Sequence, residues 1–552
     1  MLACAACAGI RANSEEARAP RTFYTVTAEI ALARHEPRVA ALQYAAAAAN
    51  ETAPELLKHA TEVAAESLQP SLTAGIAARW INADPQSADA QRDAARAALA
   101  LHKINEAAAH YRIVLLTSPL GIDAEFEALA TELAEDENIF GARQLADRLS
   151  GFFPASAAAL RLQGFAALRA DDPAAAVRSF TAASALSAPE GKESDDAEHQ
   201  QLLQTLARAR IMAGDAEEPL SRAQERLERD ATPANRLDYA LMLMTAQRDA
   251  QAIEQLDILT HHSESAPLAL RLLGLIEFQQ GRLDSAALRF AELLTKGKYL
   301  DDAFYYLALI ADRQNEPERA LRLYAQVRSG ENALPALLRA TAILNAHGAA
   351  PAAEELLDRL TEDQPQRAPQ ILAARARMYA DAGDLPRGLE VLEQAIGEYP
   401  DNVDLRYARA STYEELGKVD AALRELTDLV KQRPDDPAAL NALGFTLADH
   451  ALELARARKL IETAHAAAPK NAAILDSLGW VLFRQGHADE ALTYLEAAYA
   501  DDRGGDIGAH LGEVLWQLGK QSDAKRIWFE ALSVDADNRL LKSTLQRFHA
   551  AN

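Results

Sequence analysis

The sequence predicts an all-α fold in which about fifteen helix-turn-helix units stack into a superhelical solenoid. The chain of 552 residues is 49% hydrophobic with only 6% aromatics, and Ala dominates its apolar fraction, which favours closely packed helices. No continuous run of Val, Ile or Thr has the character of a buried strand. Small residues also recur with a period of about 34 residues, as they do in stacked helical repeats.

The charge and motif content narrow the classes of function. The net charge of −24, from 57 basic and 81 acidic residues, argues against nucleic acid as the main ligand, because a binding face would need a basic excess. The chain contains no Gly-rich phosphate loop, no His-Glu-x-x-His and no Gly-x-Ser-x-Gly. We therefore expect no catalytic residues, no metal site and no cofactor, and we expect His261-His262 to be solvated between two helices. An enzyme with a disguised site is the disfavoured alternative.

Residues 1–20 are interpreted as a leader remnant or lipidated N-terminus. The two cysteines of the chain, Cys4 and Cys7, lie in MLACAACAGI, where no second ligand pair supports zinc or redox chemistry. Small residues before a Cys are typical of a bacterial lipoprotein signal, so one of these two residues is the expected lipidation site. The basic and apolar parts of a signal peptide are missing, which indicates either an upstream start codon or an accidental pattern. No other stretch is apolar enough to span a membrane.

Residues 21–190 are predicted to form an N-terminal arm of degenerate repeats. Units near residues 21, 54 and 89 are rich in Ala, and two better units follow, around Phe126 to Pro154 and around Leu160 to Ala183. The polar stretch APEGKESDDAEH and the poor unit after it predict a hinge or a distorted repeat over 191–232.

Residues 233–538 are predicted to form nine regular units. In LDSLGWVLFRQGHADEALTYLEAAYA, Gly479 stands at the small position of the first helix and Ala491 at that of the second. This matches the tetratricopeptide pattern, in which two antiparallel helices interlock through small residues. Glycines are placed to end first helices, and prolines to stop second helices. These residues are Gly383, Gly417, Gly486 and Gly519, and Pro365, Pro400, Pro434 and Pro469. Residues 539–552 form an amphipathic segment that we expect to cap the array.

The first helix of each unit is expected to line a concave groove, because residues three or four apart share one helix face. Trp480 directly follows Gly479, so its ring is predicted to point into this groove beside other aromatic and polar residues. Such a lining suits a bound peptide or client segment. The alternative is that the rings stack across neighbouring helices and only stabilise the array, as we expect for Trp528 in the core. The candidate client-binding residues are Tyr407, Asn441, Phe445, Asp476, Trp480, Phe483, Glu513 and Trp516.

About a hundred C-terminal residues carry a more specific resemblance. NALGFTLAD at 441–449, ILDSLGW at 474–480 and AHLGEVLWQLGK at 509–520 resemble the LbcA family of bacterial tetratricopeptide-repeat lipoproteins. The resemblance implies a periplasmic adaptor anchored to the outer membrane by a lipid. Its partners would be a carboxyl-terminal processing serine protease, which it activates, and clients such as peptidoglycan hydrolases.

Two points stay open in this interpretation. The short leader departs from the family pattern, and the chain would be cytoplasmic if it starts as given. The alternative function is an envelope assembly scaffold or chaperone-like peptide binder that works without a protease.

Overall fold

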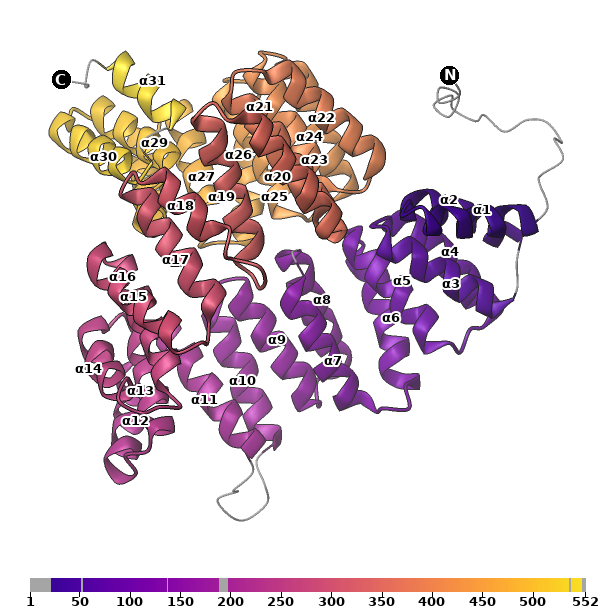
Figure 1. Ribbon diagram of the computed structural model, residues 1–552, viewed down its shortest axis with the longest axis horizontal. Helices are drawn as coiled ribbons and strands as arrows, with labels where there is room; N and C mark the ends of the chain where they lie inside the picture. The colour runs from indigo at the N-terminus through magenta and orange to yellow at the C-terminus, as the bar shows by residue number, and fades with distance from the viewer. Residues whose placement is uncertain (1–20, 51–52, 137, 188–196, 536–537, 549–552) are drawn as a thin grey trace. The chain divides into compact units, whose positions relative to one another are not determined.

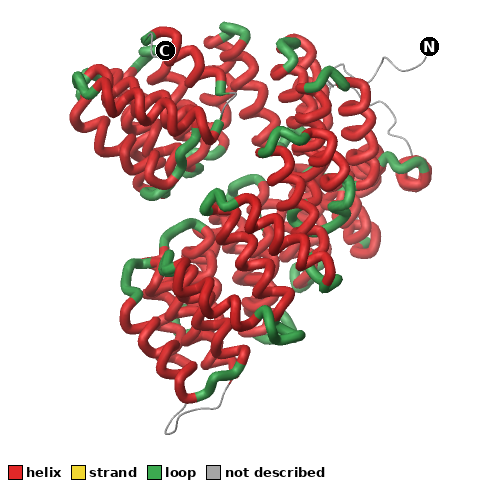
Figure 2. The backbone as a smooth tube through the Cα atoms, turned by 60° about the vertical axis from the view of Figure 1, so that its left-hand side comes forward, coloured by secondary structure: helices red, strands yellow, loops and turns green. Residues whose placement is uncertain are grey.

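The computed structural model describes residues 21–50, 53–136, 138–187, 197–535 and 538–548. Over these residues the secondary structure is helical, and within each compact unit most helices pack against the next one along the chain (Figures 1 and 2). No strand occurs in this described part. The all-α prediction is therefore confirmed. Cys4 and Cys7, and part of the predicted 191–232 hinge, lie outside the described residues.

The helices fall into three runs along the chain. The first run comprises α1 (Arg21–Ala33), α2 (Pro37–Ala47), α3 (Pro54–Glu66), α4 (Pro70–Ala83), α5 (Ala88–Ala100), α6 (Ile104–Thr117), α7 (Ile122–Glu135), α8 (Ile139–Phe152), α9 (Ala157–Arg169) and α10 (Pro173–Ser187). The second run holds α11 (Ala197–Met212) and α12 (Glu217–Arg229). A 3₁₀ turn, η1 (Ala48–Asn50), follows α2.

The third run forms the regular array. It comprises α13 (Pro233–Thr245), α14 (Asp249–Leu259), α15 (Ala266–Gln279), α16 (Leu283–Thr295), α17 (Leu300–Arg313), α18 (Pro317–Tyr324), α19 (Ala333–Ala346), α20 (Ala350–Asp363), α21 (Ala368–Asp381), α22 (Leu385–Glu398), α23 (Val403–Glu415), α24 (Val419–Gln432), α25 (Pro437–Asp449), α26 (Leu454–Ala467), α27 (Ala472–Arg484), α28 (Ala488–Asp501), α29 (Gly505–Gln517) and α30 (Gln521–Val534), closed by α31 (Arg539–Arg547). A 3₁₀ turn, η2 (Pro365–Arg367), precedes α21. The eighteen helices α13 to α30 form nine successive pairs, and α31 follows the last of them.

Local sequence signals set the ends of these helices. Asn402, Asp436 and Asn471 cap α23, α25 and α27, since each side chain accepts a hydrogen bond from a first-turn amide. The four glycines expected between paired helices have φ between 70° and 89°, the left-handed geometry that ends a helix. Helices α20, α22, α24 and α26 each end two residues before a proline, as predicted. His261 and His262 are exposed in the turn after α14, in agreement with the sequence prediction.

Small residues let the paired helices approach. Gly479 on α27 faces α28, where a Cβ would lie 2.6 Å from Leu495 Cγ and 3.0 Å from the carbonyl oxygen of Ala491. Ala491 is fully buried. The same residues that punctuate the sequence therefore set the distance between helices, and the predicted register of this unit is confirmed.

The chain separates into two compact units, residues 1–101 and 102–552. In the first unit, Tyr44, Leu57, Ile76 and Trp80 form one buried cluster, so the Ala-rich repeats do build a core. The division lies at a different place from the predicted hinge over 191–232. Beyond the undescribed residues, α11 packs on α10, with Leu202 in one cluster with Phe180. The functional division into arms stays a prediction.

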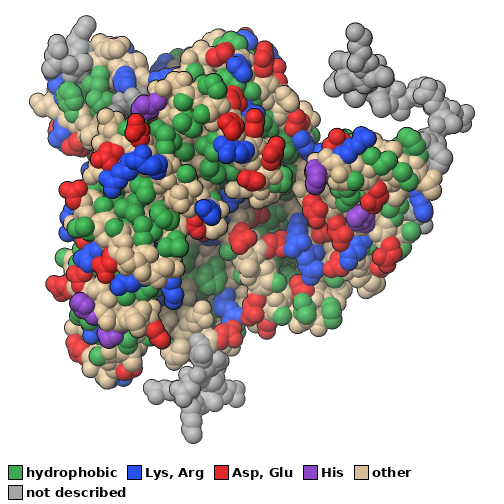
Figure 3. Space-filling model, viewed as in Figure 1, with side chains coloured by type: hydrophobic (Ala, Val, Ile, Leu, Met, Phe, Trp, Pro, Cys, Tyr) green, Lys and Arg blue, Asp and Glu red, His purple; other side chains and the backbone are tan. Residues whose placement is uncertain are grey.

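The surface seen in Figure 3 carries acidic and basic side chains in alternation. Many pairs join neighbouring repeats or turns of one helix, such as Arg289 to Asp257 at 3.0 Å. Exposed pairs of this kind contribute about 0–1 kcal/mol each, so apolar burial carries most of the stability. No helix among the described residues combines the length and apolar character needed to cross a membrane.

Candidate functional site

The eight candidate residues all lie on first helices of the C-terminal units. Helix α23 carries one of them, α25 two, α27 three and α29 two; these are Tyr407, then Asn441 and Phe445, then Asp476, Trp480 and Phe483, then Glu513 and Trp516. Helix α25 packs on α27, and α27 on α29. The candidate residues thus lie on successive first helices, and their role in client binding stays a prediction.

Trp480 does not lie open in a groove, which corrects the expectation from its position. Only 6% of the residue is exposed. Its ring stacks on His510 of α29, with centroids 4.2 Å apart, and lies 5.4 Å from the ring of Phe483. The indole N–H donates to Asp449 Oδ1 at 3.1 Å. The next unit covers the ring, so most of the surface of the Trp480 side chain packs between repeats.

Asp476 is also buried, at 6% exposure, and so is not the groove-facing polar group that we expected. Its two carboxylate oxygens each lie 2.9 Å from Nδ1 of His510, which is itself 3% exposed. Burial lowers the pKa of His510, but Asp476 and the more distant Asp449 and Asp506 outweigh it, and the pKa ends above its ordinary value. A buried Asp–His pair thus joins α27 to α29.

Sequence reasoning missed His510 entirely. It is separated from Asp476 by 34 residues, about one repeat, and this spacing was the available signal. Phe445 of α25 also reaches His510, with ring centroids 5.9 Å apart. One imidazole therefore gathers side chains from three successive first helices. We call Phe445, Asp476, Trp480 and His510 the histidine cluster.

Arg484 extends this arrangement outward. Its guanidinium lies 5.6 Å from the centre of the Trp480 ring and donates to the backbone oxygen of Asp449 at 2.6 Å. The Asp449 carboxylate, which holds the indole N–H, is 44% exposed. The accessible part of this region is therefore polar and charged, with the aromatic ring below it.

The N-terminal end of the site has a second acidic group. Glu414 of α23 accepts hydrogen bonds from Thr446 and His450, each at 3.3 Å. Burial raises the pKa of Glu414 above its ordinary value despite these partners. Nearby, the hydroxyl of Tyr407 and Oδ1 of Asn441 are buried without a hydrogen-bond partner. Burial raises the pKa of the Tyr407 hydroxyl. These two candidates retain unused hydrogen-bonding capacity.

The C-terminal end is formed by Trp516, which is half-buried. Its ring stacks on that of Trp528, with centroids 5.7 Å apart, and lies at a tilt against Phe548, with centroids 5.5 Å apart. Trp528 is fully buried and its N–H donates to the backbone oxygen of Ala509 at 3.3 Å, which confirms it as a core residue. Glu513, one turn away from Trp516, pairs with Arg547. The chain's own C-terminal segment therefore occupies this end of the site.

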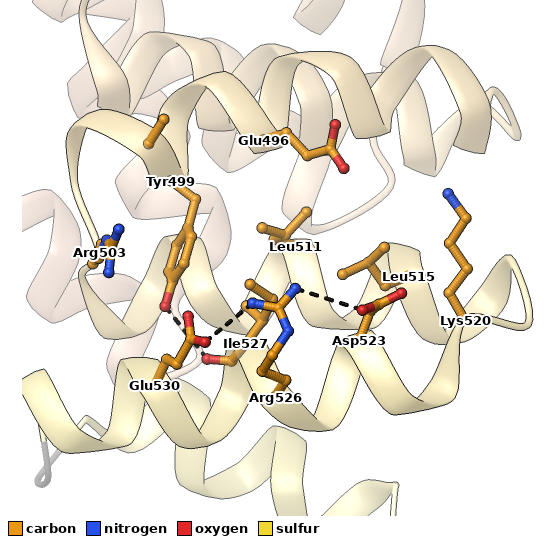
Figure 4. Close-up of a pocket in the computed structure, with 11 residues that line it drawn as sticks. Glu496, Tyr499, Arg503, Leu511, Leu515, Lys520, Asp523, Arg526, Ile527 and Glu530 are labelled. Atoms are coloured by element: carbon orange, nitrogen blue, oxygen red, sulfur yellow. Dashed lines mark hydrogen bonds and ion pairs between the residues drawn. The ribbon is translucent and has the colours of Figure 1, made fainter.

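A separate pocket of about 460 Å³ lies between α28, α29 and α30 (Figure 4). Leu511, Leu515 and Ile527 form its apolar part, and charged side chains surround them. Arg526 pairs with Glu530 at 3.0 Å and with Asp523 at 3.5 Å. Arg526 is thus paired with two anions of its own helix. In the part of the chain that the structure describes, no group of three or more His, Cys, Asp or Glu residues is placed to hold a metal ion.

Comparisons with known proteins agree with this architecture. Sequence profiles of the tetratricopeptide repeat match residues 237–301, 302–329, 344–403, 379–444, 445–506 and 477–538. The TPR repeat-containing protein PA4667 of Pseudomonas aeruginosa is 35% identical over 214 residues. That match spans 39% of this chain and 36% of the relative, so it covers well under half of either protein.

Solved structures show similar chains at low identity. A thermophilic TPR protein of Thermus thermophilus is 23% identical and has a TM-score of 0.30, covering 33% of this chain and 98% of that one. The yeast Tom70 structure is 12% identical with a TM-score of 0.31, covering 96% of this chain and 94% of its own. The Cut9-Hcn1 structure is 14% identical with a TM-score of 0.31, covering 97% of each chain.

Proposed function

Because the chain is a tetratricopeptide-repeat protein, we propose that it is a non-catalytic adaptor that binds and activates a carboxyl-terminal processing serine protease and presents client proteins to it. The repeats support the general part of this proposal, since stacked helix pairs build extended surfaces for protein–protein interaction. The resemblance of residues 441–520 to the LbcA family supports the specific part. Peptidoglycan hydrolases are the proposed clients, and the periplasmic face of the outer membrane is the proposed location.

The observation that carries the proposal is the row of aromatic and polar side chains on α23, α25, α27 and α29. The half-buried rings of Tyr407, Phe445 and Phe483, together with Asn441, keep area for a client segment. Trp516 and Glu513 would add to it once the C-terminal segment that contacts them is displaced. Trp480 and Asp476 are buried beside these residues and hold the helices together through the histidine cluster. Aromatic rings on a rigid scaffold offer large contact area at little cost in side-chain entropy.

A tagged pull-down from the native cell tests the proposal. A serine protease that co-purifies in stoichiometric amount supports the adaptor, whereas assembly proteins without a protease support the alternative scaffold. We further propose that the N-terminal arm, residues 21–190, recruits the protease and the regular array binds clients. A variant lacking residues 1–198 that still activates the protease fully would contradict this assignment.

The proposed membrane anchor requires acylation of Cys4 or Cys7 in the precursor. One lipid chain with an acylated N-terminus would tether the solenoid without a transmembrane helix. Mass spectrometry of the native protein decides this point. An unmodified N-terminus beginning at Met1 would favour the cytoplasmic alternative.

A further inference from the structure

The C-terminal helix α31 has an unusual charge for this protein. Its sequence, RLLKSTLQR, and the Phe that follows contain three basic residues and no acidic one, whereas the whole chain carries a net charge of −24. Asn538 caps its first turn by accepting from the amide of Leu541 at 2.8 Å. The segment is therefore a short, basic, amphipathic helix attached to an acidic array.

The apolar side of α31 packs on the last repeat, beside α29 and α30 (Figure 1). Leu541 is fully buried, and Leu545 is 5% exposed. Phe548, which directly follows α31, stacks on Trp528 and lies at a tilt against Trp516, with its ring centroid 5.5 Å from each. Trp516 is a candidate client residue, so α31 places its own aromatic side chain where a client's would be expected.

The basic ends of α31 meet acidic residues of three first helices. Arg547 pairs with Glu513 of α29, another candidate client residue. Arg539 pairs with Glu415 of α23 at 3.0 Å, approaches Asp381 at 3.8 Å, and donates to the backbone oxygen of Ala380 at 2.9 Å. The contacts of Arg539 bridge 124 and 159 residues of sequence, so α31 reaches well beyond the repeat that it caps.

The ionic contacts of α31 are individually weak. Both arginine side chains remain more than half exposed, and exposed ion pairs hold weakly. A nine-residue helix is also marginal by itself in water. A helix that only covered the end of the array would need apolar contacts alone. In addition to these, α31 places its basic ends against acidic residues of α21, α23 and α29.

We propose that α31 is a displaceable internal ligand of the groove, and that the external partner for this surface is a basic amphipathic helix with the same arrangement. Such a helix would place an aromatic ring against Trp516 and basic residues against Glu513 and Glu415. This inference rests on the proposed client-binding role of the groove and names the kind of client segment that it accepts. Release of α31 would be the step that opens the site.

The test uses a fluorescent peptide of residues 538–548, NRLLKSTLQRF, titrated against the full chain. In the double variant Arg539→Glu, Arg547→Glu the internal helix loses its ionic contacts and faces like charges at Glu415 and Glu513, so we expect it to leave the site. If α31 occupies the site for at least nine-tenths of the time in the wild type, the variant binds the peptide at least about tenfold more tightly. The control Arg503→Glu, Arg526→Glu changes charge equally at the pocket of Figure 4 and is expected to bind like the wild type.

Three results would overturn the proposal. The first is equal affinity of wild type and double variant, the second is no binding to either, and the third is equal binding of a peptide in which both Arg are Glu. Circular dichroism checks that the variant folds, and Arg539→Gln, Arg547→Gln serves if it does not. The assay contains no protease and no native client. A failed pull-down would therefore contradict the adaptor role but not the binding of α31 to this surface. A failed peptide titration would contradict the binding of α31 but not the adaptor role.

Discussion

The closest test of the packing scheme is Gly479→Ala, which adds one methyl group between α27 and α28. The new Cβ would lie 2.6 Å from Leu495 Cγ and 3.0 Å from the carbonyl oxygen of Ala491. Ordinary contacts between carbon atoms are about 3.5–4.0 Å, so Leu495 must shift by roughly 1 Å. The carbonyl belongs to the backbone of α28 and moves only if that helix moves.

The expected magnitude follows from two opposing terms. Overpacking of a filled core costs about 1–3 kcal/mol. Ala is favoured over Gly inside a helix by about 1 kcal/mol, which offsets part of this cost. We expect a net loss of about 1 kcal/mol. The matched control is Gly75→Ala in the middle of α4, where no atom lies within 4 Å of the added Cβ. There only the helix preference acts, and the substitution is expected to stabilise by up to about 1 kcal/mol.

Urea unfolding followed by tryptophan fluorescence measures the effect on the C-terminal repeats, because three of the four tryptophans lie in α27, α29 and α30. With a slope of about 1–3 kcal/mol per molar urea, the midpoint for Gly479→Ala is expected to fall by about 0.3–1 M. The C-terminal transition of Gly75→Ala should not move. A midpoint that is unchanged or higher in Gly479→Ala would refute the close approach of the two helices at this position.

Three further predictions concern the histidine cluster and the helix cap beneath it. Trp480→Ala is expected to destabilise the C-terminal repeats by about 3–5 kcal/mol, as is Trp528→Ala, because both rings are buried; loss of client affinity with unchanged stability would contradict the packing role of Trp480. The pKa of His510 is raised above its ordinary value of about 6.5, so the stability from its charged pair with Asp476 is present below about pH 6.5 and lost as the pH rises through the raised value. The wild-type urea midpoint should therefore fall more steeply than that of His510→Gln as the pH rises above about 6.5, and parallel curves would rule this out. Asn471→Ala removes the cap of α27 and is expected to cost about 1 kcal/mol, measured by the same transition; no change in the midpoint would show that the cap is unimportant.

Much of the fold could be predicted because its signals are local. The expected turn glycines have positive φ, and each predicted stop proline follows a helix by two residues. The degenerate units before residue 101 also form helix pairs, since amphipathic Ala-rich segments need only a neighbour to pack against. The compact division after Leu101 was not predicted. It depends on how closely neighbouring repeats pack, and no change in amino-acid composition marks it in the sequence.

For the site, the sequence determined which helix face each residue occupies, and only the tertiary structure decided what covers that face. Gly479 could be recognised as a packing residue because the repeat requires a small side chain there. The helix face of Trp480 could be predicted from its place after Gly479. The exposure of Trp480, however, depends on His510, which lies about one repeat further along the chain. In the same way, Trp516 lies on the predicted face and is covered by Phe548 from the capping segment. Helix periodicity is a property of neighbouring residues and can be read along the chain, whereas burial depends on side chains that only the stacking of successive repeats brings together.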